Sequence, residues 1–124
     1  MTTLGQENRD VRISVPAQPG YLVLARLALS AICRLTPLEH AEVADLKLAI
    51  TEAASGLVAD DRGPDELVNF EFRLHDDRIE LELDGSPSGA PQDEQELSRA
   101  IVEATVDDFQ LEDRRALLVK RFAA

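Results

Sequence analysis

Few side chains in this sequence have the types and spacing that chemistry requires. Glu52 and Gly56 stand one turn apart in a stretch that predicts a helix, so they share one face of it. A carboxylate can contribute to a site at that face, whereas glycine has no side-chain oxygen to offer a hard cation. Glu52 is therefore either a functional carboxylate or an ordinary surface carboxylate.

The other polar residues do not complete a metal or nucleophile site. His40, His75 and the single cysteine, Cys33, are spread along the chain without the spacing of a metal site. The acids at 60–61 and 65–66 lack the ordered pattern of a calcium loop, and they predict a solvated loop. We expect no metal site, and we expect Cys33 to be a small buried apolar residue.

The composition indicates an acidic protein with an aliphatic core. The chain has 124 residues, which suits one domain, and 44% of them are hydrophobic. The formal net charge of −11 disfavours direct binding to nucleic acid, so it serves either solubility or a partner with a basic surface. No apolar run approaches membrane-spanning length and no signal-peptide core is present, so we expect a cytoplasmic protein.

Residue periodicity predicts a strand and two helices in the first half of the chain. Residues 11–15 alternate apolar and polar side chains, as a half-buried strand does. Residues 21–35 predict a helix with a buried face made of Leu24, Leu27, Ala28, Ala31 and Leu35. A second helix is expected from a capping box at Thr36–Glu39 to about Val58, with a buried stripe of Leu46, Ala49, Ile50, Ala53 and Leu57.

The second half predicts four strands and a third helix. Residues 67–74 and 79–83 alternate around a turn, and a last strand pair is expected near 109–111 and 117–119. Between them, a loop precedes a helix over 93–105 with Leu97, Ile101 and Val102 inward. Adjacent strand pairs favour a mixed or antiparallel sheet with about three helices on one face, a two-layer α+β sandwich. We expect a single domain over residues 10–122, after a disordered N-terminal arm of residues 1–9.

Several segments resemble one known family. The stretch Asp45-Leu46-Lys47-Leu48-Ala49-Ile50-Thr51-Glu52-Ala53-Ala54-Ser55 is very similar to the signature helix of bacterial anti-sigma factor serine kinases. Residues 15–21, followed by Ala25-Arg26-Leu27, resemble that family's first strand, turn and helix, and residues 77–81 resemble the strand before its first glycine box. The resemblance covers most of residues 11–85. It implies the Bergerat fold of histidine kinase-like ATPases.

The resemblance also implies roles for individual residues. Glu52 occupies the position of the family's general base, and Gly56 stands where the family has an asparagine that holds magnesium on ATP. Asp84 and Gly85 lie in the region of the first glycine box, whose aspartate binds the adenine amino group. The second glycine box has no counterpart in residues 93–106, and the loop before it is too short for an ATP lid. We therefore expect no bound cofactor, with ATP and magnesium as the alternative.

The function that the resemblance implies is transcription regulation. We expect an anti-sigma factor that sequesters a sigma factor without kinase activity, because phosphoryl transfer depends on the missing metal and phosphate contacts. Its implied partners are the sigma factor, an anti-anti-sigma protein of the STAS class and a second copy of the chain, with Arg26 and Arg34 as candidate contact residues. Two alternatives stay open. One is an active serine kinase that phosphorylates its STAS antagonist, and the other is a non-catalytic adaptor in a partner-switching pathway.

Overall fold

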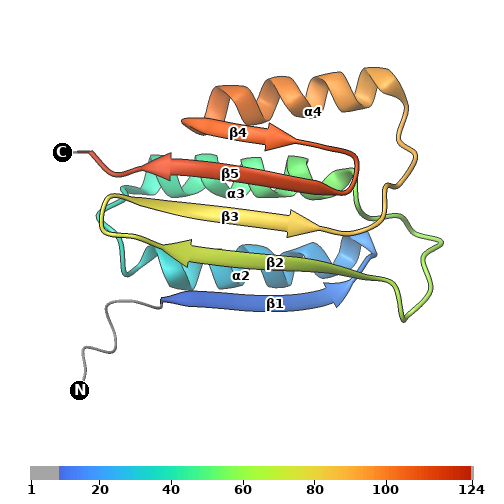
Figure 1. Ribbon diagram of the computed structural model, residues 1–124, viewed down its shortest axis with the longest axis horizontal. Helices are drawn as coiled ribbons and strands as arrows, with labels where there is room; N and C mark the ends of the chain where they lie inside the picture. Colours follow the sequence, from blue (N-terminus) through green and yellow to red (C-terminus); the bar gives the residue numbers. More distant parts are fainter. Residues whose placement is uncertain (1–8, 124) are drawn as a thin grey trace.

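The chain forms a five-stranded sheet in which all neighbouring strands are antiparallel (Figure 1). The computed structural model describes residues 9–123. The order across the sheet is β1-β2-β3-β5-β4, so the last strand in the sequence lies inside the sheet and β4 forms an edge. The strands are β1 (Asp10–Pro16), β2 (Leu67–Leu74), β3 (Arg78–Asp84), β4 (Asp108–Leu111) and β5 (Arg115–Arg121).

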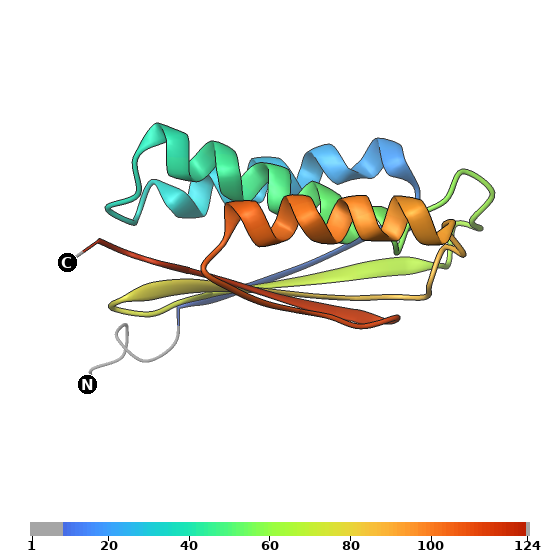
Figure 2. The ribbon, with the colours of Figure 1, turned by 90° about the horizontal axis from the view of Figure 1, so that it is seen from above.

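The three α-helices all cover the same face of the sheet, which leaves the other face open (Figure 2). A short 3-10 turn, η1 (Pro19–Tyr21), leads into α2 (Leu22–Cys33). The other two helices are α3 (His40–Ser55) and α4 (Gln92–Thr105). The α3 helix packs between α2 and α4. This arrangement confirms the predicted two-layer α+β sandwich with an antiparallel sheet.

The core lies between the sheet and the helices. Alternate side chains of β2 and β3 point into it, so Phe70, Phe72 and Leu81 are almost fully buried. On the helix side, Leu46 and Ile50 of α3 are also buried, as the helical period predicts. Each of these large side chains contributes about 1.5–3 kcal/mol by leaving water. This packing fixes α3, and therefore Glu52, relative to the sheet.

The open face of the sheet carries a cross-strand network of ion pairs. Arg73 on β2 lies at its centre, with a guanidinium nitrogen 3.1 Å from Glu80 and others 3.0 Å from Glu71 and Glu82. These side chains alternate with the buried ones, as a half-buried sheet requires. The network pairs charges of this face across neighbouring strands.

The buried face of α2 is not the one predicted, and this prediction was wrong. Leu29 is fully buried, whereas Leu27 and Leu35 of the predicted stripe are 61% and 71% exposed. Leucine and alanine occur all around this helix, so the periodicity could not choose between its faces. The residues of α2 that are buried are Leu22, Ala25, Leu29, Ile32 and Cys33.

Both ends of α3 also differ from the prediction. The capping box is made by Glu39 and Glu42, and the helix begins at His40. Thr36 instead closes the preceding turn, where its hydroxyl donates to the Cys33 carbonyl at 2.7 Å. The helix ends at Ser55 rather than near residue 58, with Gly56 as its C-cap. Gly56 therefore does not carry the penalty of a glycine inside a helix.

The α4 helix lies where it was predicted, but Leu97 was wrongly assigned to its inner face. Leu97 is 62% exposed, and the buried side chains of this helix are Val102 and Thr105. The arm predicted over residues 1–9 lies outside the described residues except for Arg9. No helix within residues 9–123 is long and apolar enough to cross a membrane.

Candidate functional site

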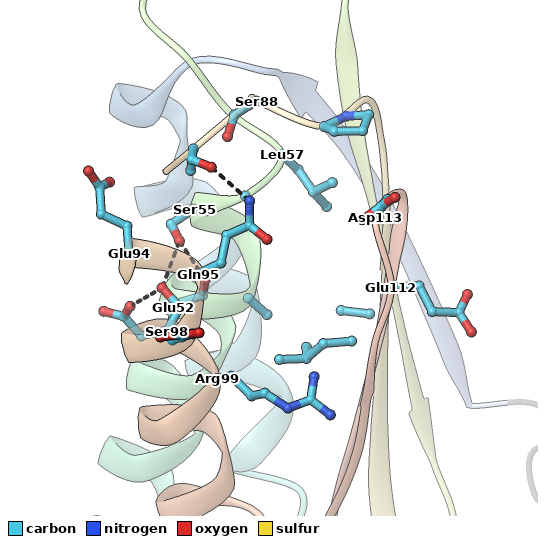
Figure 3. A pocket seen from close by; sticks show the side chains of 18 of the residues that line it. Glu52, Ser55, Leu57, Ser88, Glu94, Gln95, Ser98, Arg99, Glu112 and Asp113 are labelled. Atoms are coloured by element: carbon cyan, nitrogen blue, oxygen red, sulfur yellow. Dashed lines mark hydrogen bonds between the residues drawn. The ribbon is translucent and has the colours of Figure 1, made fainter. Parts of the chain in front are cut away.

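An open cavity of about 490 Å³ lies between the C-terminal end of α3, the link before α4, α4 itself and the β4–β5 hairpin (Figure 3). Glu52 and Gly56 both line it, so the structure brings these two sequence candidates to one place. Apolar side chains such as Leu57 and Leu111 form part of the wall. The cavity therefore lies at the end of the helix that carries the family signature.

Glu52 is held by a neighbour on the next helix. The Ser98 hydroxyl of α4 donates to Glu52 Oε1 at 2.9 Å, and the Ser55 hydroxyl lies 3.4 Å from that of Ser98 (Figure 3). Ser55 also donates to the main-chain oxygen of Glu52 at 2.6 Å. The Glu52 carboxylate, which stands at the family's general-base position, thus already accepts a hydrogen bond from a hydroxyl group of its own chain.

Position 56 has the space and the backbone geometry to accommodate a side chain. Its φ angle is −79°, and a Cβ atom built on it would meet nothing within 4 Å. Its carbonyl accepts a hydrogen bond from the Ser88 amide at 2.8 Å, which ties the link to the end of α3. Neither sterics nor strain therefore demands glycine at this position.

The link between β3 and α4, residues 85–91, is short and anchored. Arg62, whose side chain is only 10% exposed, donates to the carbonyls of Ser86 and Pro87 at 3.1 and 2.6 Å. The main-chain oxygen of Arg62 in turn accepts a bond from Gln18. The link is thus fastened to the body of the protein over the region where the family resemblance implies an ATP lid.

The structure does not bring Asp84 to the cavity. Asp84 ends β3 on the open face of the sheet, where it is exposed and its Oδ1 accepts a bond from Asn69 at 2.8 Å. Alternation along β3 explains this, because Leu83 points inward and the next residue must point outward. Gly85 packs behind the cavity, where a Cβ would lie 3.6 Å from Leu57, and it does not line the cavity itself.

Arg26 and Arg34 lie on α2, away from this cavity. Arg26 is partly buried, and its guanidinium lies 3.4 Å from the Thr51 hydroxyl of α3. Arg34 is the exposed C-cap of α2. Exposed apolar side chains lie on the same segment: Leu24 and Leu27 of α2, and Leu35 in the turn that follows the helix.

Ser98 and Arg99 are cavity residues that the sequence reasoning missed. The Arg99 guanidinium lies 5.3 Å from the centre of the Phe109 ring, in the gap between α4 and β4. The side chains of Glu94 and Glu112 point away from the cavity (Figure 3). No motif surrounds Ser98 or Arg99, and only the packing of α4 against α3 reveals them.

The remaining sequence candidates lie elsewhere. His75 is 3.1 Å from Glu80 on the open face of the sheet, and Cys33 is buried in α2. Burial raises the pKa of the Cys33 thiol to about 11, against a smaller lowering by Lys47. Within residues 9–123, no group of three or more histidine, cysteine or acidic side chains is arranged to hold a metal ion.

Comparison with known proteins identifies relatives of one kind. The chain is 31% identical over 109 residues to the serine-protein kinase RsbW of Bacillus subtilis, which covers 84% of this chain and 68% of that protein. It is 32% identical over 73 residues to RsbW of Oceanobacillus iheyensis and 29% identical over 75 residues to RsbW of Listeria innocua. These two matches span 46% and 48% of the relatives' length. No protein-family model matches the chain.

The open antiparallel sheet with three helices on one face, and the signature helix bordering a cavity, fit the fold of histidine kinase-like ATPases. The sequence comparison narrows the assignment from this fold to one family. The chain belongs to the family of the serine-protein kinase RsbW, the anti-sigma factor kinases that its signature helix resembles. The resemblance stated from the sequence is thereby confirmed.

Proposed function

We propose that this protein is a partner-switching anti-sigma factor that binds its sigma factor without using ATP. The observation that carries the proposal is Gly56, which stands one turn from Glu52 at the edge of the cavity. The family resemblance implies an asparagine there as the magnesium ligand, and glycine has no oxygen to replace it. Because the site tolerates a side chain, the glycine is a loss of chemistry rather than a demand of the fold.

Three further features of the cavity support this proposal. The link over the lid region is short and pinned by Arg62. Asp84 faces away from the cavity, so it does not offer an adenine ligand. Five carboxylates and two arginines lie around the cavity, and their summed charge repels a polyphosphate even though the side chains of Glu94 and Glu112 point outward. Phosphoryl transfer requires a positioned nucleotide and a metal, and these features oppose both.

We propose α2 as part of the surface that the protein partner covers. Leu24 and Leu27 of this helix and Leu35 in the turn after it are exposed, and no acidic residue occurs between Leu22 and Leu35. On a chain with a net charge of −11, this is an apolar surface with only Arg26 and Arg34 as charges. Exposed apolar patches of this kind are typical of protein interfaces. We propose the sigma factor as the occupant of this surface, and the STAS antagonist and a second copy of the chain as the further partners of the protein.

The test is co-purification with the sigma factors and STAS proteins of the same organism, with and without Mg-ATP. We expect a sigma factor to bind equally well in both conditions, and we expect Leu27→Glu to abolish that binding without unfolding the protein. Leu97→Glu is the matched control, because Leu97 is an equally exposed leucine on α4. Binding that requires ATP, or that survives Leu27→Glu, would contradict the proposal.

An active serine kinase is the second candidate, and one observation favours it. Glu52 is retained at the general-base position and borders the cavity. A kinase would transfer the γ-phosphoryl group of ATP to a serine of the STAS protein. Incubating the two proteins with labelled Mg-ATP decides between the candidates: labelled STAS protein would support the kinase, and its absence would support the ATP-independent binding module. A protein that binds neither a sigma factor nor ATP would be the adaptor that we expected as a further alternative.

A further inference from the structure

The first half of α4 buries no side chain against the rest of the protein. Every residue from Gln92 to Leu97 is exposed, and Ser98 is the first that is partly covered. The second half is anchored differently, because Val102 and Thr105 are buried against the body of the protein. A helical segment without buried apolar side chains has a low local stability and opens more readily than the fold as a whole.

The polar contacts of one side chain, Ser98, compensate for this missing packing. Ser98 donates to Glu52 at 2.9 Å, and its oxygen lies within 3.4 Å of the Ser55 hydroxyl. Within residues 9–123, the other side-chain hydrogen bonds from this half of α4 stay inside the helix or reach only the preceding link, as Gln95 does to the Ala90 carbonyl. The Glu52–Ser98 bond is therefore the polar tie between this segment and α3.

We propose that Glu52 and Ser98 form a clasp that gates the cavity. The segment that the clasp holds supplies one wall of the cavity, through residues 92 and 94–96. In the closed state, Oε1 of Glu52 already accepts a hydrogen bond from the Ser98 hydroxyl, so a hydroxyl or cation from outside competes with Ser98 for that oxygen. Release of Ser98 lets the first half of α4 move away and opens the cavity. The inference does not depend on which partner or ligand the protein binds.

The chemistry of the two residues suits a reversible tie. A hydrogen bond to an ionised carboxylate is stronger than one between neutral groups, yet a single one can be broken without unfolding the domain. Serine is a weaker helix former than alanine, so an exposed helix gains nothing from Ser98 unless its hydroxyl has a partner. The partner is Glu52 on the adjacent helix.

Amide hydrogen exchange of the full-length protein, followed residue by residue by NMR, tests the clasp. In Ser98→Ala, we expect the amides of Glu96, Leu97 and the residue at position 98 to exchange about ten- to a hundredfold faster than in the original protein. This is the factor expected for losing a hydrogen bond to a charged group. The amides of residues 102–105 should be unchanged. Glu52→Gln should accelerate the same segment less, because an amide oxygen still accepts the bond.

The sign of the effect separates a clasp from an ordinary helix position. Alanine has the higher helix propensity, so without a clasp Ser98→Ala would slow exchange in this segment or leave it unchanged. Ser98→Thr is the matched control, since it keeps the hydroxyl and should exchange much like the original protein. Slower or unchanged exchange in Ser98→Ala would overturn the proposal, as would Ser98→Thr behaving like Ser98→Ala.

Discussion

Gly56 follows Glu52 by one turn, but it caps α3 rather than lying within it. The two residues border the same cavity, and only Glu52 brings a side chain with functional groups to it. A helix that ended one turn earlier would leave the signature incomplete for structural reasons. Here both positions border the cavity, and position 56 has no side chain to offer to it.

Gly56→Asn should therefore be accepted by the fold and still fail to create an ATP site. The position has a negative φ and open space for a Cβ, so we expect the free energy of unfolding to change by about 0.5 kcal/mol or less. Calorimetric titration with Mg-ATP should show no binding, because the short link and the outward Asp84 persist. Tight ATP binding by this variant would mean that the glycine at position 56 alone prevents the original protein from binding ATP.

The two leucine stripes of α2 should differ sharply in their effect on stability. Leu29→Ala should lower the free energy of unfolding by about 2–5 kcal/mol, because it leaves a cavity in the core. Leu27→Ala, on the exposed stripe, should change it by about 0.5 kcal/mol or less. Urea unfolding of both variants measures the difference. A larger loss for Leu27→Ala than for Leu29→Ala would show that α2 packs with the other face inward, as the sequence had suggested.

The stabilising contribution of Glu80 should be lost in acid. Burial raises its pKa, but hydrogen bonds from Arg73, His75 and Arg78 outweigh burial and lower the pKa to about 2. A carboxyl with a depressed pKa in the folded state stabilises the fold above its unfolded pKa of 4.5, and that stability is lost as the pH falls toward 2.

Thermal unfolding between pH 7 and pH 2.5 measures this contribution. Relative to the original protein, Glu80→Gln should have a lower melting temperature at pH 7, and the difference should shrink below pH 4.5. Glu103→Gln is the control, since Glu103 is exposed on α4. A difference between Glu80→Gln and the original protein that stays constant over this range would show that the network does not depress the pKa of Glu80.

Cys33 should be unreactive in the folded protein. It is buried, and its raised pKa of about 11 leaves almost no thiolate at pH 8. A chromogenic disulfide reagent should label it slowly in buffer and rapidly in concentrated urea. Fast labelling of the native protein would show that α2 opens easily.

The sequence predicted the elements better than their orientation. The alternation in 68–74 and 79–83 is unambiguous, because within these ranges the apolar side chains all lie on one face of each strand. On α2, leucine and alanine surround the helix, and only the tertiary packing selects Leu29 over Leu27. Leu97 shows the same limit, since an apolar residue at helical spacing need not face a core.

The site was predictable only where a local motif carried it. Glu52 and Gly56 were found because the signature helix is continuous in the sequence and stays continuous in space. Ser98 is far from them in the chain, and nothing near it indicates that its hydroxyl reaches Glu52. Asp84 was predicted as a site residue because a glycine follows it. The alternation along its strand, which points it outward, was the stronger signal.

Calorimetric titration with ATP and magnesium tests most directly the central claim that the protein works without nucleotide. At about 100 µM protein, a dissociation constant near 10 µM would give a clear binding isotherm. We predict no heat beyond dilution, in keeping with the glycine at position 56 and the carboxylates around the cavity. Binding at a stoichiometry near one would contradict the account, and would make the chain an ATP-binding member of its family with Glu52 as the first residue to mutate.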